Sequence, residues 1–276
     1  LFFELCTMFR KKSLFLPSIM KIAVLQMDIV ADNVAANLAH ADALITAHPG
    51  ADLYVLPEMF STGFAMNPVD VAEPEGGDSV QWMKQKAAAT GAAIAGSVAT
   101  AVELFNFVNR MYFVTPEGEV HHYDKRHLFS YSGEHLHYES GQKRVVIDYR
   151  GVRFLLEVCY DLRFPVWSRC RDDYDVALYV ANWPVKRRLA WDTLLLARAI
   201  ENQCWVVGAN RVGVDSLGCT YNGGSVIVNA YGQPVATATE GEEAVVMAEF
   251  DGDGLRDYRQ KFPSLNDSDD FEINRG

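Results

Sequence analysis

Short apolar segments alternate with longer amphipathic ones from residue 21 onward, and this alternation constrains the fold more than any other feature of the chain. The apolar segments have the length and composition of buried strands, whereas the amphipathic segments have the periodicity of surface helices. Expected strands lie at residues 22–26, 53–56, 92–98, 175–181 and 204–209. Expected helices lie between Asn33 and Pro49, from about Asp78, and over 187–202. The pattern predicts an α/β fold.

Tight turns join three further strand pairs, and they distinguish between two architectures. These pairs are expected at 110–114 with 120–124, 144–149 with 152–159, and 224–229 with 234–239, and a last strand at 244–250. Tight turns connect antiparallel strands, whereas parallel strands need crossovers of a dozen or more residues. A single doubly wound sheet is therefore the less favoured alternative. We expect two mixed sheets packed face to face and covered by helices, a four-layer αββα sandwich.

The chain has 276 residues, of which 49% are hydrophobic and 22% charged, with no compositional break that would mark a linker. Such a length suffices for one large domain, which we expect to span residues 20–276. Residues 1–19 carry a basic trio and a short apolar stretch broken by Pro17, and we expect them to be an extension outside the fold. No apolar run in the sequence approaches the ~20 residues that a membrane-spanning helix needs.

Net charge and cysteine content narrow the possible roles further. A formal net charge of −11 repels nucleic-acid phosphates, so we expect no nucleic-acid partner and no membrane partner. The cysteines are too scattered for a disulfide framework and form no C-x-x-C pair, which indicates a reducing cytoplasm. Cys170, Cys204 and Cys219 are interpreted as small buried hydrophobic residues. The five cysteines are Cys6, Cys159, Cys170, Cys204 and Cys219.

Three polar residues stand where expected strands end: Glu58, Lys125 and Cys159. Loops at strand ends shape the crevices in which α/β proteins place functional side chains. Each residue taken singly has an ordinary structural interpretation, but a thiol, a carboxylate and an ammonium together suit amide hydrolysis. The carboxylate takes the proton of the thiol and returns it to the leaving ammonia, while the ammonium stabilises the oxyanion. This chemistry needs no metal and no cofactor.

The sequences that flank these residues resemble the three signatures of the nitrilase superfamily of carbon–nitrogen hydrolases. Glu58 follows a strand, Lys125 precedes His-Leu-Phe129, and Cys159 opens Cys-Tyr-Asp-Leu-Arg-Phe-Pro165. The resemblance extends from about Met20 to Phe271. It implies hydrolysis of a small non-peptide amide through a thioester on the cysteine.

The resemblance also implies two further groups in the site. The loop from Gly133 to Gly141 resembles the loop that carries a second active-site glutamate, which we assign to Glu134, with Glu139 as the competing candidate. Glu134 would orient the lysine and keep it charged. The backbone N–H of Tyr160, next to the nucleophile, would be the second donor to the oxyanion.

Within the superfamily, these segments are most similar to bacterial omega-amidases. The similarity implies water-dependent release of ammonia from the terminal amide of an α-keto acid monoamide such as 2-oxoglutaramate. Trp183 is a candidate apolar wall, and Arg187 and Arg188 are candidates for binding the substrate carboxylate or are a solvated helix face. Nitriles, N-carbamoyl amino acids and other short amides stay open as substrates, as does a non-catalytic binding role. The resemblance implies a homodimer or a higher homo-oligomer.

Several nearby polar residues allow interpretations outside the catalytic set. Five histidines between positions 121 and 137 lack the helical spacing of a metal site, so we expect hydrogen-bonding roles for them. We expect Asp161 and Arg163 to pair with other charged groups and hold the turn, rather than to contact substrate. Glu157 is expected either to approach the active site or to pair with Arg153, and the sequence does not decide between these.

Overall fold

The computed structural model describes residues 19–103 and 105–273, which form two large mixed sheets. The first sheet has the strand order β15-β1-β2-β4-β5-β6, and the short β3 pairs with β4. Its strands are β1 (Ile19–Gln26), β2 (Leu53–Val55), β3 (Glu73–Pro74), β4 (Ala93–Glu103), β5 (Asn106–Val114), β6 (Val120–Asp124) and β15 (Ala244–Asp251).

The second sheet has the strand order β14-β13-β10-β9-β8-β7. Its strands are β7 (Val146–Tyr149), β8 (Val152–Val158), β9 (Val176–Ala181), β10 (Trp205–Asn210), β13 (Val226–Val228) and β14 (Pro234–Thr237). A separate two-stranded hairpin pairs β11 (Val212–Val214) with β12 (Thr220–Asn222).

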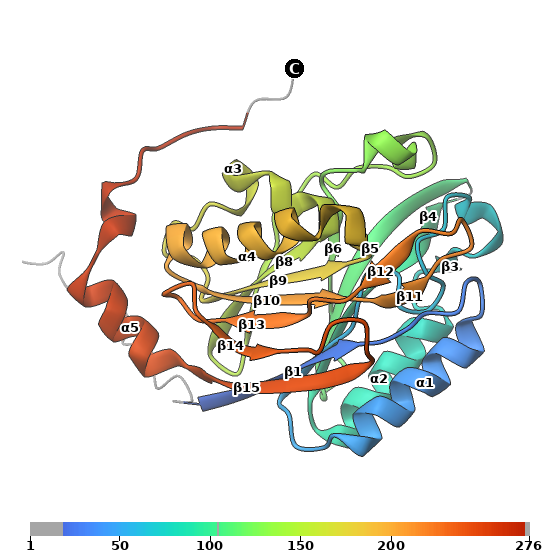
Figure 1. The fold of residues 1–276 in the computed structure, drawn as a ribbon, viewed down its shortest axis with the longest axis horizontal. Coiled ribbons are helices and arrows are strands. Elements are labelled where there is room, and N and C mark those ends of the chain that lie inside the picture. Colours follow the sequence, from blue (N-terminus) through green and yellow to red (C-terminus); the bar gives the residue numbers. More distant parts are fainter. Residues whose placement is uncertain (1–18, 104, 274–276) are drawn as a thin grey trace, which may run out of the picture.

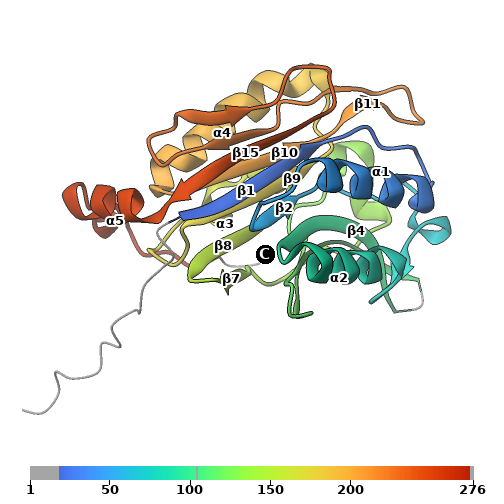
Figure 2. The ribbon, with the colours of Figure 1, turned by 90° about the horizontal axis from the view of Figure 1, so that it is seen from below.

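Helices cover the outer faces of both sheets, which gives the four-layer αββα sandwich that the sequence predicts. Helices α1 (Val34–Ala47) and α2 (Asp78–Thr90) pack on the first sheet, and α4 (Arg188–Asn202) packs on the second. Figures 1 and 2 show α4 and the α1–α2 pair on opposite sides of the sheets. The remaining helices are α3 (Pro165–Ser168), α5 (Gly252–Lys261) and the 3-10 turns Pro68–Asp70, Ser130–Ser132, Glu134–Leu136, Cys159–Arg163, Val185–Arg187 and Ser264–Asp267.

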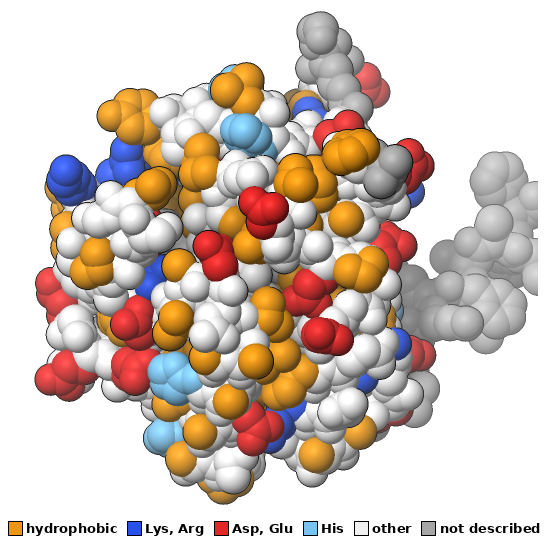
Figure 3. Space-filling view, turned by 90° about the vertical axis from the view of Figure 1, so that its right-hand side faces the viewer, with side chains coloured by type: hydrophobic (Ala, Val, Ile, Leu, Met, Phe, Trp, Pro, Cys, Tyr) orange, Lys and Arg blue, Asp and Glu red, His pale blue; other side chains and the backbone are white. Residues whose placement is uncertain are grey.

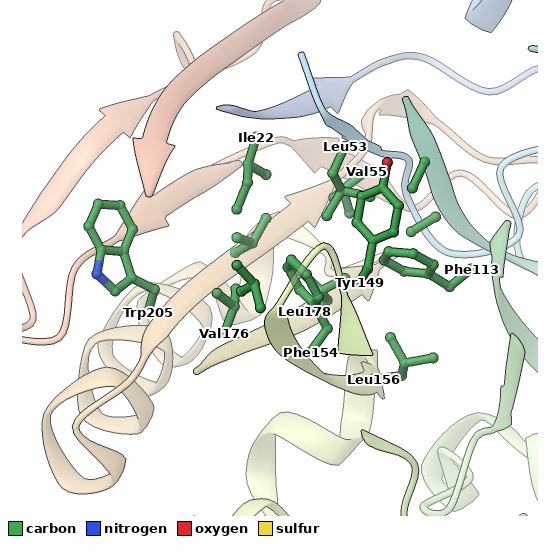
Figure 4. Close-up of a cluster of buried hydrophobic side chains, with 14 of the residues drawn as sticks. Ile22, Leu53, Val55, Phe113, Tyr149, Phe154, Leu156, Val176, Leu178 and Trp205 are labelled. Atoms are coloured by element: carbon green, nitrogen blue, oxygen red, sulfur yellow. The ribbon is translucent and has the colours of Figure 1, made fainter. Parts of the chain in front are cut away.

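The largest buried hydrophobic cluster lies between the two sheets (Figure 4). Leu53 and Val55 come from the first sheet, and Phe154, Leu156 and Leu178 from the second, and none of these side chains is exposed. The central strands are apolar on both faces because the other face of each sheet is covered by helices. This double covering explains why the strands appear in the sequence as continuous apolar runs rather than alternating ones.

Strand direction brings the ends of several strands to one edge of the molecule. Strands β1, β2 and β4 are parallel, and two antiparallel steps through β5 return β6 to the direction of β4. Strands β8, β9 and β10 are also parallel to one another. The carboxyl ends of β2 and β6 therefore share one edge of their sheet, and those of β8 and β9 share one edge of theirs.

Most expected elements are present with boundary shifts of a few residues, but several were missed, including the short β3 and α3. Helix α5 and the hairpin β11–β12 lie in the polar segments at 252–261 and 212–222, which lack a clear hydrophobic period. The expected extension at 1–19 lies outside the described residues except for Ile19, which pairs with Asp251 at the start of β1. The fold therefore includes residue 19, one position earlier than expected.

Among the described helices, none has the length and apolarity that crossing a membrane requires. Figure 3 looks onto the end of the molecule that carries β11 and β12 in Figure 1. Acidic, hydrophobic and basic side chains are interspersed over the described part of that face rather than gathered into one basic surface.

Replacement of Leu178 by alanine tests the importance of the inter-sheet core. Because Leu178 is fully buried there, Leu178→Ala should lower the free energy of unfolding by about 2–5 kcal/mol. Leu189→Ala is the matched control, since that side chain on α4 is 81% exposed and its loss should change stability by less than about 0.5 kcal/mol. Urea unfolding monitors both, and equal effects would contradict the packing described.

Candidate active site

One pocket of about 330 Å³ collects the residues that follow four strand ends. Glu58 follows β2, Lys125 follows β6, Cys159 follows β8 and Asn182 follows β9. The two sheets each supply part of this set because their carboxyl ends meet at the same edge. Residues that are up to 124 positions apart in the sequence are thus in direct contact.

Lys125 lies in the floor of the pocket between two carboxylates. Its Nζ donates to Glu58 Oε1 at 2.9 Å and to both carboxylate oxygens of Glu134, at 3.0 and 2.9 Å. The three side chains are each at most 1% exposed. Asn109 on β5 links the carboxylates, because its Nδ2 donates to Glu58 at 2.8 Å and to Glu134 at 3.3 Å. A buried ion pair is tolerated only when its remaining lone pairs are satisfied in this way.

Asn182 fixes the orientation of Glu58 from the second sheet. Its backbone N–H donates to Glu58 Oε2 at 2.8 Å, and its Nδ2 donates to the Glu58 carbonyl at 2.9 Å. The Glu58 carboxylate therefore receives hydrogen bonds from Lys125, Asn109 and Asn182, so its plane is set from both sheets.

Burial and neighbouring charges set the protonation of this cluster. Burial alone would lower the pKa of Lys125, but the carboxylates of Glu134 and Glu58 outweigh it and hold that pKa well above its ordinary value. Burial raises the pKa of Glu134, against the opposing effect of Lys125. Burial and the adjacent Glu58 carboxylate also raise the pKa of Cys159, against Lys125. Cys159 is thus a neutral thiol at rest, beside a group that can accept its proton.

Cys159 occupies a left-handed backbone conformation, with φ of 48°, at the start of the 3-10 turn Cys159–Arg163. A residue with a side chain adopts this conformation at a cost of about 1–2 kcal/mol, and such strain is common at functional sites. The conformation turns the chain sharply at the end of β8. The backbone N–H of Tyr160 lies in the first turn, where N–H groups lack acceptors within the helix itself.

Aromatic and basic side chains form the walls of the pocket. Trp183 is 3% exposed, and the guanidinium of Arg163 lies 5.0 Å from the centre of its ring. The guanidinium of Arg187 lies 5.0 Å from the ring of Phe129 and 5.1 Å from that of Tyr131. Neither guanidinium has an ion pair or a hydrogen bond within residues 19–103 and 105–273, so both are available to a ligand.

A carbon-nitrogen hydrolase family model matches residues 21–260. The chain belongs to this family. The predicted membership of the nitrilase superfamily, and with it the class of hydrolase acting on carbon–nitrogen bonds other than peptide bonds, is confirmed.

Two curated relatives of this carbon–nitrogen hydrolase match nearly their whole length. "Omega-amidase YafV" of Escherichia coli (strain K12) is 50% identical over 254 residues, which cover 92% of this chain and 98% of the relative. "2-oxoglutaramate amidase" of Bacillus subtilis (strain 168) is 35% identical over 252 residues, covering 89% and 96%. The crystal structure of XC1258 from Xanthomonas campestris, a CN-hydrolase superfamily protein, matches with a TM-score of 0.90 and 40% identity over 93% of this chain and 99% of that one.

Not every residue expected to bind substrate reaches the pocket of this carbon–nitrogen hydrolase. Trp183 and Arg187 line it, but Arg188 does not, because its Nε donates to Asp192 at 2.7 Å and its guanidinium packs against Gly224. The expectation that Arg163 pairs with a charged group was wrong, since its guanidinium faces the pocket instead. Arg187 and Arg188 differ in this way because consecutive residues of a helix point about 100° apart.

Several groups at the site were missed by sequence reasoning. Asn109 lies in a strand that also carries Asn106 and Arg110, so its polarity alone did not mark it as a site residue. Cys219 and Tyr221, from the hairpin β11–β12, also line the pocket. Cys219 was expected to be buried, but it is partly exposed, whereas the other two cysteines interpreted in that way are buried. The hairpin itself was not predicted, so no signal placed Cys219 near the site.

Among the described residues there is no group of three or more His, Cys, Asp and Glu side chains that could hold a metal ion. His127, from the histidine-rich segment, instead contacts the Asp161 carboxylate through Nδ1 at 2.8 Å. Neither Glu134 nor Glu139 lines the pocket, but Glu134 contacts Lys125 directly.

Glu157 lies beneath the site rather than in it. It neither lines the pocket nor pairs with Arg153, whose Nε and Nη2 donate to Asp175. Its side chain is fully buried next to Tyr179, its register partner on β9. Neither carboxyl oxygen of Glu157 has a hydrogen-bond partner among the described residues. Burial, reinforced by the charge of Asp161, raises the pKa of Glu157 well above its ordinary value.

Glu157→Gln should stabilise the protein by an amount that grows with pH. In the unfolded chain Glu157 ionises near its ordinary pKa, whereas the folded state keeps it protonated because its pKa is raised. The folded state therefore binds more protons, and the stability of the natural protein falls as pH rises above about 5. Urea unfolding at about pH 5 and pH 8 measures the difference. The control is Glu117→Gln on an exposed turn, and a gain for Glu157→Gln that shrinks as pH rises would contradict the assignment.

Proposed function

We propose that this carbon–nitrogen hydrolase is an omega-amidase, which releases ammonia from the terminal amide of a small α-keto acid monoamide such as 2-oxoglutaramate. The names of the Escherichia coli and Bacillus subtilis relatives support this substrate class. The products are a dicarboxylate and ammonia, and water is the second substrate.

One observation carries the proposal: the pocket contains the carboxylate, ammonium and thiol that amide hydrolysis needs. It also contains two guanidinium groups that have no ionic partner among the described residues. The chain has a net charge of −11, yet Arg163 and Arg187 face the pocket without an ionic partner among the described residues. The Glu58 and Glu134 carboxylates are already engaged by Lys125. An anionic substrate therefore supplies the missing countercharge, and guanidinium groups suit a carboxylate because they can bind both of its oxygens.

In the acylation step the Cys159 thiol attacks the amide carbon while Glu58 accepts the thiol proton. The C–N bond then breaks as Glu58 returns that proton to the leaving nitrogen, and ammonia departs. A thioester between Cys159 and the substrate acyl group is left. The raised pKa of the thiol supports a proton transfer coupled to attack rather than a resting thiolate.

In the deacylation step Glu58 takes a proton from water, and the resulting hydroxide attacks the thioester carbon. The C–S bond breaks, the sulfur regains a proton through Glu58, and the dicarboxylate leaves. The N–H of Tyr160 donates to the oxyanion in both steps. Lys125 Nζ also donates to it, with the N–H that it gives to Glu58 Oε1 in the free enzyme, since its other two N–H groups are held by Glu134. One such donor is commonly worth about 3–4 kcal/mol. Glu134 holds Lys125 charged and pointed at the pocket, as its two hydrogen bonds support.

Three broader features are also proposals. Residues 20–276 act as one domain, because both sheets contribute to one pocket. The four described cysteines are all free, which agrees with a reducing cytoplasm. The enzyme forms a homodimer or a higher homo-oligomer, and light scattering in solution tests this.

Cys159→Ala should abolish ammonia release while leaving the unfolding midpoint nearly unchanged, because it removes the nucleophile and few packing contacts. Cys204→Ala is the control, since that thiol is buried away from the pocket. Retention of more than a small fraction of turnover by Cys159→Ala would exclude the covalent mechanism.

The same mechanism predicts that Glu58→Gln accumulates an acyl-enzyme when it is given an activated ester, whose leaving group needs no proton from Glu58. The variant cannot activate water against the thioester, so the adduct persists. Mass spectrometry of peptides should locate an acyl adduct on Cys159. An adduct that maps to another cysteine would contradict the assignment of the nucleophile.

Arg163→Met should separate charged from neutral substrates. It keeps much of the side-chain volume but loses the charge, so kcat/KM for 2-oxoglutaramate should fall by about 10–100-fold, with little change for a neutral amide such as propionamide. Arg171→Met is the matched control, because that arginine is exposed and lies over Phe271 away from the pocket. Ammonia release across oxoacid monoamides, nitriles, N-carbamoyl amino acids and neutral amides measures the preference, and a faster rate with any other class would refute the omega-amidase proposal.

A further inference from the structure

We propose that Asp161 is a positioning residue that sets the placement of Cys159 relative to Lys125. The inference rests on the proposed roles of those two residues as nucleophile and oxyanion donor. Asp161 is itself fully buried and does not line the pocket. It acts through its hydrogen bonds to the segments that carry the two reacting side chains.

The Asp161 carboxylate joins the two segments directly. On the nucleophile side, Oδ2 accepts from the backbone N–H of Val158, the residue before Cys159, at 2.9 Å. On the lysine side, Oδ2 accepts from the Tyr123 hydroxyl at 2.9 Å, and Oδ1 accepts from the backbone N–H and the Nδ1 of His127, at 2.9 and 2.8 Å. Tyr123 and His127 stand two residues before and two residues after Lys125. The Asp161 side chain thus holds one residue on each side of the lysine and the residue just before the cysteine.

These connections cross between the two sheets. Val158 ends β8 in the second sheet, and Tyr123 lies in β6 of the first. In the core between the sheets the contacts are made by close-packed apolar side chains, which specify spacing less precisely than directed hydrogen bonds such as these and those of Asn182. A fixed hydrogen-bond set at the pocket edge is therefore what places the lysine relative to the sulfur.

The partners of Asp161 are themselves held in place. The Tyr123 oxygen accepts from Trp167 Nε1 and from the backbone N–H of Arg126, both at 3.1 Å, so its single hydroxyl hydrogen is left to point at Asp161. The His127 ring stacks on Phe164 with centroids 3.8 Å apart and planes 9° from parallel. With both partners oriented, a shift of the carboxylate would break several bonds at once.

The conformation of the nucleophile requires such a restraint. Cys159 has a φ of 48°, and strain of this kind persists only where the surroundings determine the backbone. Asp161 binds the N–H that immediately precedes it. Within the described part of the chain Asp161 has no ion pair with a Lys or Arg, and a buried carboxylate of this kind is costly compared with an apolar residue. Its presence is explained by the geometry that it imposes.

The test measures the alkylation rate of Cys159 by iodoacetamide in Asp161→Asn and in Tyr123→Phe, with kcat and KM for the substrate. Both variants should slow alkylation and lower kcat by about 10–100-fold, with KM within about twofold, because the placement of reacting groups changes but the carboxylate-binding wall does not. Alkylation needs no substrate, so it tests the positioning role separately from the omega-amidase proposal.

Two matched controls and an internal standard separate positioning from general stability. Asp175→Asn alters another buried aspartate, which binds Arg153 and Arg259, and Tyr112→Phe alters a buried tyrosine on the helix-covered face of β5. Both should alkylate Cys159 at the natural rate. Cys219 lines the same pocket from an unconnected hairpin, so its labelling, followed by peptide mass, should not change in any variant.

A folded Asp161→Asn protein with the natural alkylation rate and kcat would overturn the inference. So would faster labelling of Cys219, Cys170 and Cys204 together, since that indicates general loosening. If Asp161→Asn does not fold, Tyr123→Phe decides, because it removes one hydroxyl and little volume. Failure of Cys159 to label selectively in the natural protein would refute the proposed nucleophile and this inference with it.

Discussion

The buried ammonium of Lys125 between two carboxylates is the interaction on which the rest of the site depends. Taking these three charges out of water is costly, and it is offset only because each oxygen and each N–H finds a partner within about hydrogen-bonding distance. The Lys125, Glu58 and Glu134 side chains satisfy one another, with Asn109 linking the carboxylates. Burial and the adjacent Glu58 carboxylate raise the pKa of the neighbouring Cys159 thiol, against the effect of Lys125, so the thiol is neutral at rest.

The fold can hold this cluster because the carboxyl ends of strands from both sheets lie at the same edge of the molecule. An ordinary βαβ arrangement brings β2 and β4 to that edge, and the antiparallel hairpin β5–β6 returns a third strand to it. Face-to-face packing then places Cys159 from the second sheet beside groups from the first. Hydrophobic burial between the sheets stabilises the fold. Hydrogen bonds from Asn182 and Asp161, which cross between the sheets at this edge, set the positions of the site residues.

Charge is distributed so that recognition and chemistry occupy different parts of the pocket. Two carboxylates line the pocket, and both are engaged by the protein: Glu58 by Lys125 and Asn182, and Asp215 by Cys219 and Tyr221. The guanidinium groups of Arg163 and Arg187 instead lie over aromatic rings in its walls. Aromatic faces attract a guanidinium without neutralising it, so the positive charge stays available. In the proposed function these two groups orient an anionic substrate with its uncharged amide toward Cys159.

The sequence by itself determined the layers, the strand ends and the three residues Glu58, Lys125 and Cys159, because apolar periodicity and local motifs are properties of consecutive residues. Only the tertiary structure decided that Arg163 faces the pocket while Arg188 turns to Asp192. It also decided that Asn109 links two carboxylates and that Glu157 lies below the site with no hydrogen-bond partner among the residues that the structure describes. These outcomes depend on which side chain of another segment stands opposite, and that is settled by how two sheets and a helix pack in three dimensions.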